Sequence, residues 1–130
     1  MNGDVLTDLD FGAFYRRHCS SGALATIAVY RKQVDIALGV LDVDDRDRVR
    51  SYDEKPVLHY LVSTGIYCFH PRVLDYLDAG EPCDLPVLIK KLIAAGEDVR
   101  AVRVEGSWLD IGRPEDYEVA QEMYERGAFS

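Results

Sequence analysis

Two aspartates and one lysine are the residues of this chain best suited to chemistry. Asp4 ends the tripeptide Asn-Gly-Asp, Asp110 lies in the segment Trp-Leu-Asp-Ile-Gly, and Lys55 lies between Glu54 and Pro56. Two carboxylates can hold a divalent cation, and a lysine ammonium can meet a phosphate. Such a set is typical of phosphotransfer, which also needs a glycine-rich loop to hold a nucleotide. The chain contains no such loop, so the residues predict half of an active site, with the other half upstream of Met1.

The composition narrows the class of protein. The chain has 130 residues, of which 48% are hydrophobic, which is enough for one domain with a core. A net charge of −8 argues against a nucleic-acid partner, which would need a basic surface. Three cysteines without CxxC spacing predict neither a disulfide framework nor a zinc site. No signal peptide or long apolar run is present, so we expect a cytoplasmic protein with no membrane partner.

Apolar periodicity predicts mixed strands and helices. The expected elements are a helix from its cap at Asp10 to about Gly22, strands over 25–30, 36–43, 49–54 and 61–69, a short helix from Pro71 to about Gly80, a helix from Asp84 to Gly96, a strand over 99–104 and a helix from Pro114. An acidic turn at 44–47 joins two of these strands as a hairpin. Both hairpin and crossover connections occur, which favours a three-layer α/β domain with a mixed sheet. Motifs at strand ends then lie where open α/β sheets bind ligands.

Each charged motif also has a plainer interpretation. The tripeptide ending at Asp4 is a common turn, although only Met1 precedes it where a full strand is expected. Asp110 stands among apolar residues, where a carboxylate needs a cation or backbone donors. Pro56 predicts an extended Lys55, with the Lys55 and Glu54 side chains on opposite sides of the strand end. A solvated charged turn explains this last motif about equally well.

Other residues have weaker claims to a function. Gly39 and Gly65 interrupt apolar strands, which indicates a bulge or the close approach of a ligand or backbone. Asp8-Leu9-Asp10 spells the DxD of metal-dependent glycosyltransferases, but Asp10 is better explained as a helix N-cap. The three histidines lack the spacing of metal ligands, so we expect them to be surface or internally satisfied residues without a catalytic role: His18, His59 and His70.

In this order and spacing, the segments resemble the sugar-1-phosphate nucleotidyltransferases, or NDP-sugar pyrophosphorylases, and especially their mannose-1-phosphate guanylyltransferase-like branch. The matching stretches cover nearly the whole chain: NGDVLTDLDF, ATIAV, GVLDVD, EKP, VSTGIYCFHPRVLDYL, DLPVLIKKLIAAG and GSWLDIGRPEDYEVA. The resemblance implies a Rossmann-like α/β sandwich that joins a sugar 1-phosphate to the α-phosphorus of a nucleoside triphosphate and releases pyrophosphate. It also implies the site residues: Mg²⁺ held by Asp4 and Asp110, the sugar phosphate bound by Lys55, sugar hydroxyls bound by Glu54, and a sugar pocket lined by backbone near Gly39 and Gly65.

The chain departs from that family at its start, because the family's N-terminal glycine-rich loop is missing. Residues 1–130 therefore resemble the C-terminal part of such a domain, without the N-terminal nucleotide-binding strands, and we expect this part alone to be inactive. An uncovered sheet edge near Met1 and 25–30 predicts a homo-oligomer.

Two other functions stay open at this point. One is a non-catalytic sugar-phosphate binding or interaction module, and the other is a DxD glycosyltransferase that uses Asp8 and Asp10. The coding sequence upstream of Met1 would separate the first of these from an enzyme half. The sequence identifies neither the nucleotide base nor the sugar.

Overall fold

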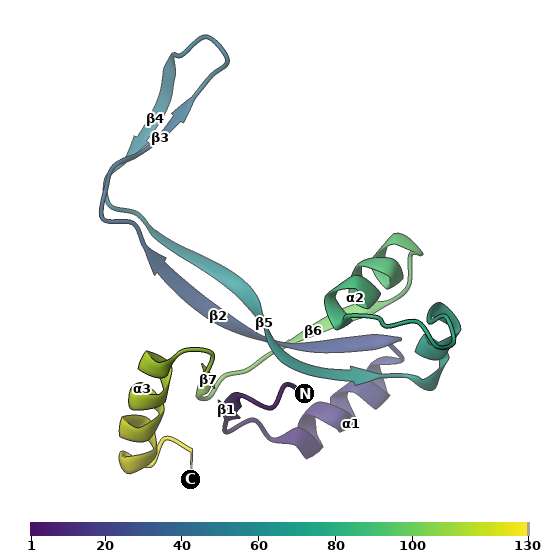
Figure 1. The fold of residues 1–130 in the computed structure, drawn as a ribbon. Helices are drawn as coiled ribbons and strands as arrows, with labels where there is room; N and C mark the ends of the chain where they lie inside the picture. Colours follow the sequence, from purple (N-terminus) through teal and green to yellow (C-terminus); the bar gives the residue numbers. More distant parts are fainter. Residues whose placement is uncertain (130) are drawn as a thin grey trace. The chain divides into compact units, whose positions relative to one another are not determined.

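The computed structural model describes residues 1–129, and the chain divides into two compact units (Figure 1). The first, here called the body, comprises residues 1–30 together with the chain from residue 63 onward. The second, the arm, comprises residues 31–62. Two long strands, β2 (Ala25–Asp35) and β5 (Val57–Phe69), run through both units.

The body contains a mixed three-stranded sheet in the order β5-β2-β6, in which β6 (Val99–Arg103) runs parallel to β2. A separate antiparallel ladder joins β1 (Val5–Thr7) to β7 (Trp108–Asp110). The helical elements of the body are α1 (Phe11–Ser21), the 3₁₀ helix η1 (Pro71–Tyr76), α2 (Leu85–Ala94) and α3 (Pro114–Glu125). None of the helices in residues 1–129 is long and apolar enough to cross a membrane.

Helices cover both faces of the body sheet, because β2 alternates buried residues between two apolar clusters. On one face, Ala25 packs in a cluster with Leu88 and Leu92 of α2. On the other, Ala28 packs in a cluster with Phe14 of α1. Burial on both faces explains the near-continuous apolar run of this strand. The result is the expected three-layer α/β arrangement.

The arm is a β-ribbon built from the outer parts of β2 and β5 and from the hairpin of β3 (Val40–Val43) and β4 (Val49–Asp53) (Figure 1). Hydrogen bonding continues at its bend, where the Ile36 amide donates to the Pro56 carbonyl at 3.1 Å. Asp44 shapes the hairpin tip by accepting from the Arg46 and Arg48 amides. The predicted hairpin and its acidic turn are therefore confirmed.

The helix signals were accurate at both ends of α1. The Asp10 carboxylate accepts from the Ala13 amide at 2.8 Å, and Gly22 ends the helix with a φ of +69°. Such a cap satisfies a backbone donor that the helix itself leaves free. Asp84 also stands at the N-cap of α2, although its side chain makes no capping hydrogen bond.

Several strand predictions were wrong in extent. The expected strand over 36–43 is interrupted, because 36–39 form a bend between β2 and β3. The predicted turn at Trp108 contains a short strand, and its partner β1 was missed. Both strands of this ladder have three residues, which is too few for a periodic signal.

The open sheet edge expected near 25–30 was also wrong, whereas the homo-oligomer itself stays a prediction. This part of β2 is the central strand of the sheet and is largely buried. Its backbone is paired on both sides, so it offers no open edge.

Candidate functional site

The β1–β7 ladder brings Asp4 and Asp110 together from opposite ends of the chain. Asp110 lies directly opposite Val5, the residue after Asp4. The Ile111 amide, next to Asp110, donates to the Asp4 carbonyl at 2.8 Å. The backbones of the two residues therefore lie side by side, whereas a cleft shared by their carboxylates stays a prediction. Asp110 ends its strand as expected, whereas Asp4 lies in the turn that leads into β1.

Both carboxylates are available to a ligand. Asp4 and Asp110 are exposed, and within residues 1–129 neither side chain has a hydrogen bond or an ion pair. No group of three or more His, Cys, Asp or Glu side chains in the same residues could hold a metal by itself. That Asp4 and Asp110 hold a cation together, with its other ligands from water or substrate, stays a prediction. That is a common arrangement for Mg²⁺ beside phosphates.

Gly65 lies against the turn that carries Asp4. Its φ is +76°, a conformation that favours glycine, and its carbonyl accepts from the Asn2 amide at 3.1 Å. A methyl group at this position would lie 2.6 Å from Asn2 Nδ2, so only glycine fits without a shift. The close approach predicted from the sequence is therefore that of the protein's own turn. Whether this backbone also lines a sugar pocket stays a prediction.

Trp108 supports the same corner of the body. Its indole Nε1 donates to the Thr64 carbonyl at 3.2 Å, and its ring lies 5.4 Å from that of Tyr30 between centroids. Thr64 is buried and donates in turn to the Ala28 carbonyl at 2.7 Å. These contacts tie β7, and with it Asp110, to the sheet of the body.

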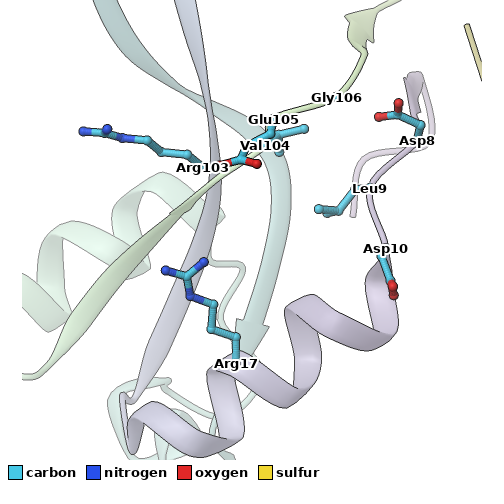
Figure 2. Close-up of a pocket in the computed structure, with 8 residues that line it drawn as sticks. All are labelled: Asp8, Leu9, Asp10, Arg17, Arg103, Val104, Glu105 and Gly106. Carbon is cyan, nitrogen blue, oxygen red and sulfur yellow. The ribbon is translucent and has the colours of Figure 1, made fainter.

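A hollow of about 330 Å³ lies beside the alternative DxD pair (Figure 2). Both of its aspartates are bound to backbone: Asp8 accepts from the Ser107 amide at 2.7 Å, and Asp10 caps α1. Asp8 also fills the space over Gly106, where no side chain would fit. These structural contacts account for both carboxylates and favour the plainer interpretation of the DxD.

In the arm, Tyr52 joins two of the predicted sugar-site residues. Its ring covers Gly39 so closely that a methyl group there would overlap it. Its hydroxyl donates to Glu54 Oε2 at 2.8 Å, and this hydrogen bond raises the pKa of Tyr52 above its usual value. Gly39 and Glu54 therefore share one surface of the arm.

The backbone conformation of Lys55 contradicts one prediction. Its φ is +46°, in the left-handed region rather than the extended one that Pro56 was expected to impose. The residue lies at the bend where the chain leaves the pairing of β4 with β3 and enters β5. Ribbon pairing on both sides of the bend overrides the local preference, at a cost of about 1–2 kcal/mol for a non-glycine residue. The Lys55 ammonium has no ion pair within residues 1–129.

The histidines fit their expected structural roles. His18 is buried, its Nδ1 lies 2.7 Å from Thr26 Oγ1, and its pKa is lowered chiefly by burial and then by the charge of His70. His70 accepts from the Arg72 amide and caps η1. The hydrogen bonds of these two rings, to Thr26 and to the Arg72 amide, do not involve the turn at Asp4.

A family model for nucleotidyl transferases matches residues 1–127. The chain belongs to this family. Similar proteins include a UTP–glucose-1-phosphate uridylyltransferase from Synechocystis sp., 36% identical over 122 residues, and mannose-1-phosphate guanylyltransferase 1 from Arabidopsis thaliana, 30% identical over 127 residues. The matches cover 88% and 95% of this chain but only 31% and 35% of those proteins. The chain thus spans about a third of the length of these relatives.

Solved structures show the same fold. HddC from Yersinia pseudotuberculosis superposes with a TM-score of 0.62 at 23% identity, over 95% of this chain and 53% of that one. Its complex with GMP-PN gives a TM-score of 0.61 at 22% identity. This nucleotidyltransferase chain therefore has the mixed α/β architecture expected from its sequence.

Two residues near the candidate site were missed from the sequence. Tyr52 precedes Glu54 by two positions, and strand alternation could have placed their side chains on one face. Asn2 packs on Gly65, a residue far away in the sequence, and no local signal indicates that contact.

Proposed function

We propose that this chain is the metal- and sugar-phosphate-binding C-terminal part of a sugar-1-phosphate nucleotidyltransferase. The reaction would join a sugar 1-phosphate to a nucleoside triphosphate, giving an NDP-sugar and pyrophosphate. The observation that supports the proposal is the adjacency of Asp4 and Asp110 along the β1–β7 ladder, with no side-chain partner for either within residues 1–129, in a member of the nucleotidyl transferase family.

Mg²⁺ fits the donors at this corner. Hard carboxylate oxygens suit it, and it usually takes one or two protein carboxylates together with substrate phosphates. When bound, it would neutralise charge on the triphosphate during transfer. The contribution of the chain is to hold Asp4 and Asp110 in place through the β1–β7 ladder, the contact of Asn2 with Gly65 and the Trp108 hydrogen bond.

Lys55 and Glu54 would bind the other substrate. A sugar phosphate is already a nucleophile, so the chain needs no general base. The Lys55 ammonium would bind this phosphate and aim its oxygen in line with the α-phosphorus, and the Glu54 carboxylate would accept from sugar hydroxyls. Loss of one preorganised charge of this kind costs about 3–4 kcal/mol of transition-state stabilisation.

The two relatives use different bases and sugars by name, a uridylyltransferase for glucose 1-phosphate and a guanylyltransferase for mannose 1-phosphate. We therefore propose the class of substrate, a hexose 1-phosphate, and leave the base open. Because the chain spans about a third of such proteins, we also propose that it has no turnover alone.

Paramagnetic broadening by Mn²⁺, a substitute for Mg²⁺, tests the metal site directly. In amide NMR spectra of the chain, substoichiometric Mn²⁺ should broaden residues 3–5 and 109–112 first. Asp4→Asn and Asp110→Asn should each abolish that pattern. Asp8→Asn is the matched control and should leave it intact.

A different pattern would reject the assignment. Broadening centred on residues 8–10 would support the DxD alternative instead. Diffuse broadening over many acidic side chains, insensitive to Asp4→Asn, would show only the attraction of a cation to a chain of net charge −8.

Binding of mannose 1-phosphate or glucose 1-phosphate, followed by ³¹P NMR, tests the second substrate site. Lys55→Ala should weaken binding, whereas Lys32→Ala, another arm lysine without an ion pair in residues 1–129, should not. Equal losses of affinity in both variants would mean that Lys55 contributes only general positive charge and makes no specific contact with the phosphate. A pyrophosphate-release assay with GTP, UTP, CTP, ATP and dTTP should show no turnover, and clear Mg²⁺-dependent turnover would refute the half-site.

A further inference from the structure

The segment that leads into β1 contains the only asparagine of the chain, and a glycine follows it. Asn2 precedes Gly3, whereas the two other side-chain amides, those of Gln33 and Gln121, precede a valine and a glutamate. The backbone nitrogen of the residue after an asparagine can attack the side-chain carbonyl carbon, because the two close a small, unstrained ring. Glycine permits this attack best, since it has no Cβ that would crowd the nitrogen.

The fold leaves both reacting groups of this dipeptide accessible. Asn2 and Gly3 are exposed, and Gly3 lies in a turn. Within residues 1–129, neither the Asn2 side-chain amide nor the Gly3 backbone amide makes a hydrogen bond. A methyl group at Gly3 would meet no atom within 4 Å, so the space beside the attacking nitrogen is open. The two groups can therefore react without first breaking another polar contact.

The contact of Asn2 with Gly65 opposes this reaction. The Asn2 backbone amide donates to the Gly65 carbonyl at 3.1 Å. A methyl group at Gly65 would lie 2.6 Å from Asn2 Nδ2 and 2.9 Å from Asn2 Cγ, so the carbon that must be attacked packs directly on Gly65. Ring closure has to turn this carbon toward the Gly3 nitrogen. The packing therefore restrains the reaction, and it does so without enclosing an exposed side chain.

We propose that Asn2 is a site of spontaneous deamidation in the folded protein and that its contact with Gly65 limits the rate. The Gly3 nitrogen gives its proton to solvent and attacks Asn2 Cγ. The bond between them forms, the Cγ–Nδ2 bond breaks, and the departing nitrogen takes a proton from solvent and leaves as ammonia. Water then opens the cyclic imide at one of its two carbonyls, which gives aspartate or isoaspartate. The net reaction consumes one water and releases one ammonia.

The modification changes the corner of the body that contains Asp4. An aspartate at position 2 adds a carboxylate two residues before Asp4 and takes the net charge of the chain one unit below −8. An isoaspartate also lengthens the backbone by one carbon inside the turn. The deamidation itself does not depend on the catalytic role proposed above.

Peptide mapping by mass spectrometry tests the site in the folded 130-residue chain, incubated at mildly alkaline pH. The peptide with Asn2 should change from amide to acid and separate into aspartate and isoaspartate forms, while the peptides with Gln33 and Gln121 keep their amides. Conversion should be faster at higher pH, because the Gly3 nitrogen must lose its proton. An Asn2 that stays intact in the folded chain while it converts in the urea-unfolded chain overturns the proposal, and so does equal conversion of the glutamines.

Gly3→Ala tests the cyclic route. The added methyl group has room in the fold but crowds the attacking nitrogen. Conversion should slow at least about tenfold, the effect of a barrier higher by about 1.4 kcal/mol. An unchanged rate in Gly3→Ala would show that water attacks the side chain directly and would refute the route through Gly3.

Gly65→Ala tests the restraint, because its methyl group displaces the Asn2 side chain and should speed conversion. Gly22→Ala is the matched control, since Gly22 also has a positive φ but a methyl group there meets no atom within 4 Å. It should convert at the wild-type rate. Equal acceleration in both variants would mean that general loosening of the fold sets the rate, and no acceleration in Gly65→Ala would mean that the contact does not restrain Asn2. Either result refutes the role of Gly65.

Discussion

The body and the arm share two strands but not a core. In β5, the body part contains Ile66, which is buried, whereas the arm part contains Val57, Tyr60 and Leu61, each more than half exposed. The two parts are similarly apolar, and helices of the body pack against the body part. The difference shows that apolar sequence supplies the tendency to be buried and that neighbouring elements decide whether burial occurs.

Stability should therefore reside in the body. Leu92 is fully buried in α2, and Leu92→Ala should lower the free energy of unfolding by about 2–5 kcal/mol through lost burial and a cavity. The same substitution in the arm, Leu41→Ala, should stay within about 0.5 kcal/mol, because Leu41 is 47% exposed. Urea denaturation of the two variants measures both changes in the free energy of unfolding.

Comparable losses in the two variants would break the comparison. They would mean that Leu41 is covered by other parts of the same chain. A change in the urea dependence of either variant, rather than in its midpoint alone, would indicate loss of two-state unfolding.

Backbone geometry offers a second contrast, this time inside the body. Gly65 and Gly22 both have positive φ, but a methyl group at Gly22 meets open space and one at Gly65 meets Asn2. Gly22→Ala should cost about 1–2 kcal/mol for the left-handed backbone alone. Gly65→Ala should cost about 1–3 kcal/mol more, because the packed turn must move.

Chemical denaturation of the two glycine variants gives these values. Amide shifts at residues 2–5 should change in Gly65→Ala and stay unchanged in Gly22→Ala. Equal costs would show that the contact with Asn2 adjusts freely and does not hold the turn at Asp4.

The same body–arm contrast explains what the sequence could predict. Helix α1 was predictable because its cap, its apolar stripe and its C-terminal glycine are neighbours in the sequence. The β1–β7 ladder was not, since three-residue strands depend on a partner at the other end of the chain. The extended Lys55 was a sound local inference that failed, because pairing on both sides of the bend determines its conformation.

The residues of the candidate site also divide into those that the sequence could predict and those that it could not. Residue type and motif alone predict four candidate residues, Asp4, Asp110, Glu54 and Lys55, and the structure brings the backbones of the two aspartates side by side. The contacts that hold their surroundings, such as Asn2 on Gly65, connect distant segments and leave no local trace. Tyr52 is an intermediate case, since strand alternation could have predicted that it lies beside Glu54.

A weaker effect on stability is expected at acidic pH, through the buried His18. Burial lowers the pKa of His18, so the folded state binds its proton less readily than the unfolded state, whose pKa is near the ordinary 6.5. Stability due to this group is complete above that value and is lost as pH falls below it, until the folded pKa is passed. The free energy of unfolding should decline on acidification through this window.

Denaturation curves of His18→Gln and His59→Gln, measured from pH 8 downward, separate this site from the rest of the chain. The His18 variant should be less stable at pH 8 but should lose less stability below the ordinary value of 6.5. His59, exposed in the arm, is the control and should follow the wild type. If the free energy of unfolding fell equally with pH in the wild type and both variants, groups other than His18 would cause the loss of stability.

The smallest expected effect lies in the arm, at the hydrogen bond from Tyr52 to Glu54. This bond raises the pKa of the phenol because ionised Tyr52 could no longer donate and would face a carboxylate. Glu54→Gln should therefore bring the pKa of Tyr52 down toward its ordinary 10.0, while the free energy of unfolding changes by no more than about 0.5 kcal/mol.

Asp53→Asn is the control, because it removes an adjacent carboxylate that does not make this hydrogen bond, and it should leave the pKa of Tyr52 unchanged. NMR titration of the Tyr52 ring tests this, and equal shifts in both variants would show a field of nearby charge rather than a formed contact. A shift confined to Glu54→Gln would mean that the arm, without a core, still holds one predicted sugar-site residue in a defined position.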